Sequence, residues 1–148
     1  MKQFLNIIPS KFQTTFHRAF DVCADWKLSL DSVKKLGFNR LLTSGQEKTA
    51  LEGRKRIREY VEHLNQESSL IIVPGAGITA ANIEIILNET LCKEFHASCR
   101  STRSSQMIYK NEKISMGTPG SDEYMMKFTD ILKVKFLSEI YNKRFFQT

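Results

Sequence analysis

Residues 70–78, with the sequence LIIVPGAGI, constrain the fold of this chain more than any other stretch. Leu70 to Val73 form an unalternated apolar run, the pattern of a strand buried on both faces in a parallel sheet. Gly75 and Gly77 follow at once, and a helical pattern begins near Thr79. Glycines let the backbone turn sharply, and the N–H groups at a helix N-terminus favour an anion. We therefore expect a βα unit whose functional groups lie in the turn after the strand.

The same order of strand, polar turn and helix recurs along the chain. Strands are predicted at residues 13–20, 38–43, 70–73 and 94–99. Helices are predicted at residues 26–36, 49–64, 80–88 and 123–141, the last with a break near 129–130. Strands that alternate with helices pair in parallel through right-handed crossovers. The predicted fold class is α/β, with about four parallel βα units that amount to half of a TIM (β/α)₈ barrel.

The length of 148 residues predicts a single domain over 1–148, truncated at its N-terminal side relative to a full barrel. Residues 13–99 supply the four strands and their connecting helices, while 100–148 supply a long polar loop and a C-terminal helix. Residues 1–12 resemble the end of a helix and a connector. Half a barrel leaves two unpaired strand edges, so we expect a homodimer or a complementing half-barrel as partner.

Composition narrows the classes of partner. The net charge is +6, but the basic residues are scattered over predicted helix faces, which favours a small anionic ligand and no nucleic acid. The first eight residues are too short and polar for a membrane span, so no membrane partner is expected. Three cysteines without a CxxC pair indicate free thiols in a reducing compartment, cytoplasmic or also nuclear.

The first predicted strand places His17 and Arg18 on opposite faces. His17 and His96 could share a metal or act as acid and base in a pocket, or be core histidines bonded to backbone carbonyls. A buried Arg18 would need a carboxylate, with Asp21 and Glu52 as candidates.

Other polar residues at the ends of the predicted strands leave two interpretations open. Thr43 and Ser44 end a strand, where they either reach the pocket or cap a turn. No carboxylate pair, nucleophile elbow, Walker loop or zinc spacing is visible. The residues therefore point away from an enzyme.

Four motifs follow one another in the order and spacing of one family. They are TFHRAFD at 15–21; LTSGQ at 42–46 with ALEG at 50–53; VPGAGI at 73–78 with NI at 82–83; and EFHAS at 94–98 with ISMG at 114–117 and DEY at 122–124. They resemble the copper homeostasis protein CutC family, a TIM barrel, over about residues 13–140. The resemblance is to strands five to eight only. Ala97 stands where the family usually has Ser, and Cys99 where a small residue is common.

The resemblance implies copper(I) handling, although the family's first four strands, which carry the cysteines proposed as copper ligands in animal members, have no counterpart here. Cys23 and Cys99 are candidate copper(I) ligands, because thiolates suit this ion, or else small buried apolar residues.

The barrel resemblance also implies an anion site at the loops after the last two strands. Backbone N–H groups at Gly75 and Gly77 would hold the anion, with a hydroxyl from Ser98 and a charge from Arg100. Otherwise the two glycines merely allow a tight turn. The alternative function is therefore a TIM-barrel enzyme or binder of a small phosphorylated or anionic metabolite, with His17 and His96 beside that turn.

Overall fold

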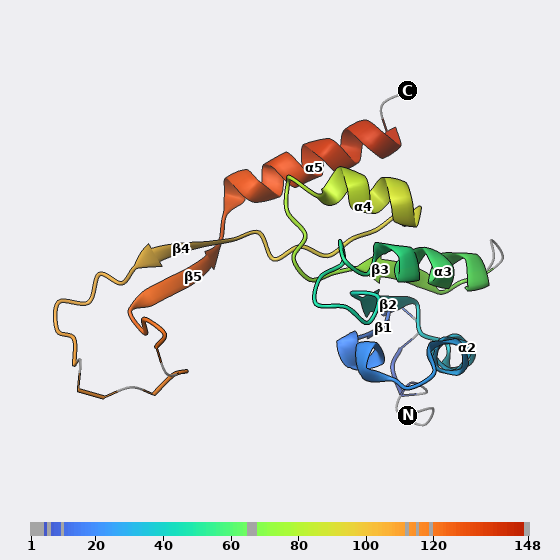
Figure 1. Cartoon of the computed structure of the whole chain (residues 1–148), viewed down its shortest axis with the longest axis horizontal. Helices are drawn as coiled ribbons and strands as arrows, with labels where there is room; N and C mark the ends of the chain where they lie inside the picture. The colour runs from blue at the N-terminus through green and yellow to red at the C-terminus, as the bar shows by residue number, and fades with distance from the viewer. Residues whose placement is uncertain are drawn as a thin grey trace. The chain divides into compact units, whose positions relative to one another are not determined.

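The computed structural model describes Leu5 and residues 7–9, 11–64, 68–111, 113–114, 116–118 and 120–146. The chain forms two compact units, Met1–Ala97 (unit 1) and Ser98–Thr148 (unit 2), each drawn in Figure 1. The expected helix end within residues 1–12 falls partly on residues 1–4, 6 and 10, outside the described residues.

Unit 1 is built on a parallel sheet in which neighbours in sequence are neighbours in space. Its strands β1 (Thr15–Phe16), β2 (Arg40–Thr43) and β3 (Ile71–Pro74) lie in the order β1-β2-β3 (Figure 1). The predicted fourth strand contributes one parallel bridge, between His96 and Gly75. The α/β class and the parallel pairing of these segments are confirmed, while the last strand is shorter than predicted.

The first predicted strand, 13–20, is wrong beyond Phe16. Arg18–Val22 form a short 3₁₀ helix, η1, instead of continuing the strand. The imidazole Nδ1 of His17 accepts a hydrogen bond from the backbone N–H of Ala19 at 3.0 Å and so caps η1. A capped turn ends the alternation, so the opposite faces assigned to His17 and Arg18 do not exist.

Three helices follow the strands of unit 1: α2 (Trp26–Leu36), α3 (Arg54–Leu64) and α4 (Ile83–Thr90). α2 has the predicted bounds because Asp25 caps its N-terminus and Gly37, at φ 89°, ends it. α3 begins five residues later than predicted, after a turn over residues 50–53. α4 begins and ends later than the predicted 80–88. α3 packs between α2 and α4.

The core of unit 1 lies between the sheet and these helices. Its fully buried large side chains are those of Phe20, Leu30, Leu41, Ile57, Tyr60, Ile83, Ile86 and Leu87. The ring of Tyr60 meets Phe20 edge-on at 5.4 Å and lies 5.0 Å from the Trp26 ring. Burial raises the pKa of Tyr60, so its hydroxyl stays protonated. That hydroxyl has no hydrogen-bond partner among the described residues.

Replacing Tyr60 by phenylalanine should therefore stabilise unit 1. Removing a buried hydroxyl that lacks a partner recovers its desolvation cost, so the free energy of unfolding should rise by about 1 kcal/mol. Urea unfolding followed by the fluorescence of Trp26, the single tryptophan, measures this change. A lower free energy of unfolding would instead show that the hydroxyl is bonded, for example to a buried water.

Unit 2 pairs two strands that the sequence did not predict. β4 (Arg100–Ser104) and β5 (Met125–Thr129) form an antiparallel hairpin, and α5 (Ile131–Phe146) follows. The loop predicted at 100–122 thus begins with a strand. The helix predicted at 123–141 begins at the expected break instead, because Asp130 accepts a hydrogen bond from the N–H of Leu132 at 2.9 Å and caps α5.

Candidate functional site

A cluster of polar side chains gathers where β1 and β2 end in unit 1. Asp21, on η1, accepts hydrogen bonds from Arg18 Nε at 2.7 Å and from the backbone N–H of Ser44 at 3.1 Å. The hydroxyl of Thr43 donates to the other carboxylate oxygen of Asp21. Arg18 Nη2 also donates to the Ser44 hydroxyl at 2.7 Å. We call Arg18, Asp21, Thr43 and Ser44 the Asp21 cluster.

The cluster holds the loop between β2 and α3. The backbone N–H of Gln46 donates to Asp21 at 3.3 Å, and the Gln46 side chain donates to the carbonyl oxygen of Cys23 at 2.8 Å. Gly45, at φ 74°, lets this loop meet the backbone of Gly53. η1 and the β2–α3 loop are therefore joined by one hydrogen-bond network.

Burial and hydrogen bonding oppose each other at Asp21. Its side chain is 7% exposed, and burial alone raises the pKa of the carboxyl. Hydrogen bonds from Thr43, Arg18 and Ser44 favour the charged form and outweigh burial, so the pKa of Asp21 lies below its ordinary value of 3.8. A carboxylate occupied by this many donors is a weak proton acceptor, so its chemistry is to hold the loop in place.

The structure brings together three predicted site residues, Arg18, Thr43 and Ser44. Asp21 is confirmed as the carboxylate partner of Arg18, and Arg18 is 43% exposed rather than buried. The other candidate, Glu52, accepts hydrogen bonds from the backbone and hydroxyl of Thr49 in a capping box before α3.

His17 and His96 lie apart in the strand order. His17 follows β1 at one edge of the sheet, and His96 pairs beside β3 at the other, with β2 and β3 between them. Both are exposed. The shared metal and the acid–base pair therefore stay predictions, whereas a capping role for His17 is observed.

The turn after β3 is tight, as the two glycines in its sequence indicate. The N–H of Gly75 donates to the carbonyl oxygen of Thr43 at 2.9 Å, so it belongs to the sheet. Ala76 and Gly77 have φ angles of 84° and 69°. The Ala76 carbonyl accepts from the N–H of Ala50 at 3.0 Å, which ties this turn to the β2–α3 loop.

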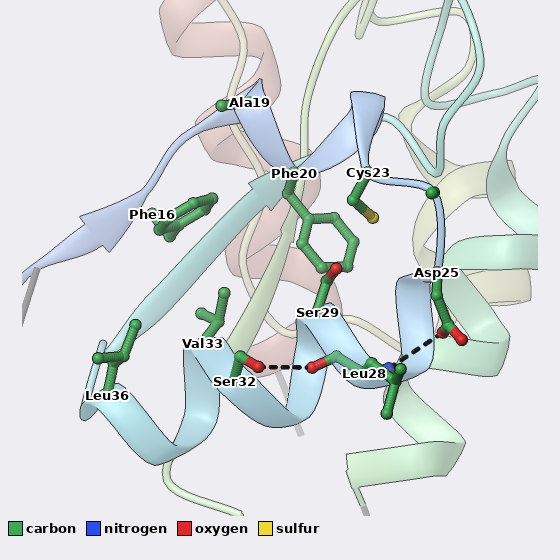
Figure 2. A pocket seen from close by; sticks show the side chains of 11 residues that line it. Phe16, Ala19, Phe20, Cys23, Asp25, Leu28, Ser29, Ser32, Val33 and Leu36 are labelled. Atoms are coloured by element: carbon green, nitrogen blue, oxygen red, sulfur yellow. Dashed lines mark hydrogen bonds between the residues drawn. The ribbon is translucent and has the colours of Figure 1, made fainter.

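The remaining predicted residues, Ser98, Cys99 and Arg100, belong to unit 2, so their roles beside the β3 turn stay predictions. Cys23 lines a recess between η1 and α2, of about 460 Å³ (Figure 2). In the part of the chain that the structure describes, no group of three His, Cys, Asp or Glu side chains is placed to hold a metal. No described helix has the length and apolarity to cross a membrane.

Sequence reasoning missed the central residue of the cluster. The sequence offers Asp21 only as one candidate carboxylate partner of Arg18, and it offers Gln46 and Gly53 only as members of the family motifs. An available signal was the combination of an aspartate just after a strand with a Thr-Ser-Gly turn just after the next strand. Adjacent parallel strands bring their carboxyl ends to the same edge of a sheet, where such groups meet.

The sequence pattern of the CutC family matches residues 2–101. The chain is 42% identical over 85% of its length to a human protein named copper homeostasis protein cutC homolog, covering 46% of that protein. It is 44% identical over 82% of its length to a CutC family protein of Parabacteroides distasonis, covering 49% of it.

A solved structure gives the same result. It is that of a Streptococcus agalactiae protein assigned as the copper homeostasis protein CutC, and it aligns with a TM-score of 0.52 at 37% identity. The alignment covers 57% of this chain and 41% of that one. The chain spans about half the length of the curated relatives that it matches, and it belongs to the CutC family.

Proposed function

We propose that this chain takes part in copper homeostasis, with copper(I) as the ion that it handles rather than as a resident cofactor. The observation that carries the proposal is the 42% identity, over 85% of the chain, to a human relative named for copper homeostasis. Because the chain spans about half of that relative, the activity has to be tested on this chain directly.

The three thiols differ in their availability to copper(I). Burial raises the pKa of Cys92 to about 11, so its thiol is protonated and inaccessible near neutral pH. Cys23 and Cys99 are half-buried and form no disulfide bond. Copper(I) prefers soft thiolate ligands and accepts two of them. These two thiols are the ligands that we propose.

A copper(I) titration under anaerobic conditions tests this assignment. Thiolate-to-copper absorption should appear in the wild-type chain and should disappear when Cys23→Ser and Cys99→Ser are combined. Cys92→Ala is the matched control, and it should leave the copper stoichiometry unchanged. A stoichiometry that is unaltered in the double variant would remove both ligands from the proposal.

The turn after β3 supports a second candidate, the binding of a small anion. The N–H of Gly77 donates to no acceptor among the described residues. Ala76, whose N–H faces the His96 carbonyl in the parallel bridge, holds a φ of 84°, a strained value for a residue with a Cβ. A free N–H group in a turn that leads toward a helix is suited to phosphate or a carboxylate.

Phosphate titration followed by amide NMR tests the anion candidate. The amide of Gly77 should shift with phosphate and not with an equal concentration of chloride. Gly120, another glycine with a positive φ, lies in unit 2 and is the internal control. Equal shifts at Gly120, or none at the turn, would exclude a specific site there.

We also propose that the sheet of unit 1 is part of a (β/α)₈ barrel. The parallel order β1-β2-β3, with the bridged segment at His96 beyond β3, supports it, as does the likeness to the Streptococcus agalactiae structure. Four neighbouring strand positions make up half of the eight that close such a barrel.

A further inference from the structure

The sheet of unit 1 has two open edges within the described residues. At one edge, β1 pairs with β2 on one side only, and at the other the segment at His96 pairs only with the residue after β3. Open parallel edges present unpaired backbone groups that can accept another strand. The two edges differ, because each offers a different side of a strand that runs in the same direction.

Beside β1, the surface of unit 1 is hollowed. The recess between η1 and α2, about 460 Å³, is lined largely by the apolar side chains of Phe16, Phe20, Leu28, Val33 and Leu36 (Figure 2). Leu28, from α2, is 68% exposed at this recess. In a βα repeat, the helix of the preceding unit packs beside the next strand and its helix, so the recess has the position where such a helix would dock.

We propose that this edge and recess, the β1 surface, bind a second copy of this chain. The inference rests on the barrel architecture proposed above. A twofold rotation about the barrel axis would bring the His96 edge of each copy to the β1 edge of the other, in the parallel direction that both edges require. Two copies of four strand positions give eight, so both pairs of open edges close in one assembly.

A second copy is favoured as occupant for a reason internal to the chain. The β1 surface needs a parallel strand edge with a helix further along the chain, and the His96 segment is such an edge, with α5 as the next helix after β4 and β5. Each of the two contacts in the dimer would then cover both the unpaired backbone groups of β1 and the exposed side chain of Leu28.

Light scattering on the full chain tests the proposal. The expected mass is about 34 kDa, twice the chain mass of 17.1 kDa. Leu28→Glu should raise the dissociation constant of the dimer at least about tenfold. Ser32→Arg, a second exposed position lining the recess, should do the same. Lys55→Glu, an exposed position on α3, which packs between α2 and α4 away from both open edges, is the matched control and should dissociate the dimer much less.

Circular dichroism confirms that each variant is folded before its mass is interpreted. A wild-type chain that stays monomeric at high concentration overturns the proposal. So does a dimer that both recess variants leave intact. A monomer that gains mass only with the separate N-terminal half of a full-length relative would assign the β1 surface to a complementing half-barrel instead. None of these results depends on copper, so they test the dimer without testing the copper proposal.

Discussion

Replacing Gly53 by alanine is expected to abolish stable folding of unit 1. A Cβ on Gly53 would lie 1.9 Å from the carbonyl oxygen of Ser44 and 3.0 Å from the Cα of Gly45. Both of these atoms belong to the backbone, so no side-chain rotation relieves the clash. Ser44 is fully buried and bonded within the Asp21 cluster, which prevents the loop from moving away. We expect a loss of about 4 kcal/mol or more in the free energy of unfolding.

Gly37→Ala is the matched control for the same chemical change. Gly37 has a φ of 89°, and a Cβ there would meet no atom within 4 Å. Its substitution therefore costs only the backbone strain of a left-handed residue, about 1 kcal/mol. Urea unfolding followed by Trp26 fluorescence compares the two variants. Equal losses would show that the β2–α3 loop shifts freely, and that the close approach of the two backbones is not required for the fold.

The parts of unit 1 that could be predicted from the sequence are those with local signals. The strand β3 follows from an apolar run ended by a Pro-Gly turn, and α2 follows from its spacing of apolar residues with Gly37 after it. Each of these two signals is contained in a segment of about ten residues. Each segment also contributes apolar residues that the fold buries.

The parts that could not be predicted depend on distant partners. η1 replaces the end of the first strand because Asp21 bonds Thr43 and Ser44, more than twenty residues further along the chain. β4 and β5 are almost wholly exposed, β4 is polar throughout, and neither shows the alternation of a half-buried strand. No local sequence pattern predicts that these two strands pair across the loop between them. The position of the Asp21 cluster likewise depends on the order of the strands in the sheet, which the pattern of each single strand does not give.

Replacing Asp21 by asparagine is expected to loosen the β2–α3 loop and to destabilise unit 1. Asparagine keeps the shape but loses the charge and one acceptor oxygen, while Thr43 and Ser44 stay fully buried with donors to satisfy. Losing charge-assisted hydrogen bonds at a buried carboxylate should lower the free energy of unfolding by about 3 kcal/mol. Urea unfolding at neutral pH measures it. Asp25→Asn, at the exposed N-cap of α2, is the control and should change stability little, because both residues cap well.

The pH dependence separates a lost charge from a lost shape. The pKa of Asp21 is lowered in the folded chain, so its contribution to stability is complete above the ordinary value of 3.8 and is lost as the pH falls through the folded pKa. At neutral pH the free energy of unfolding of the wild-type chain should exceed that of Asp21→Asn by the full amount. Below pH 3.8 that difference should shrink, because a protonated Asp21 donates and accepts much as asparagine does. A difference that stays constant with pH would mean that packing, rather than the carboxylate charge, joins η1 to the β2–α3 loop.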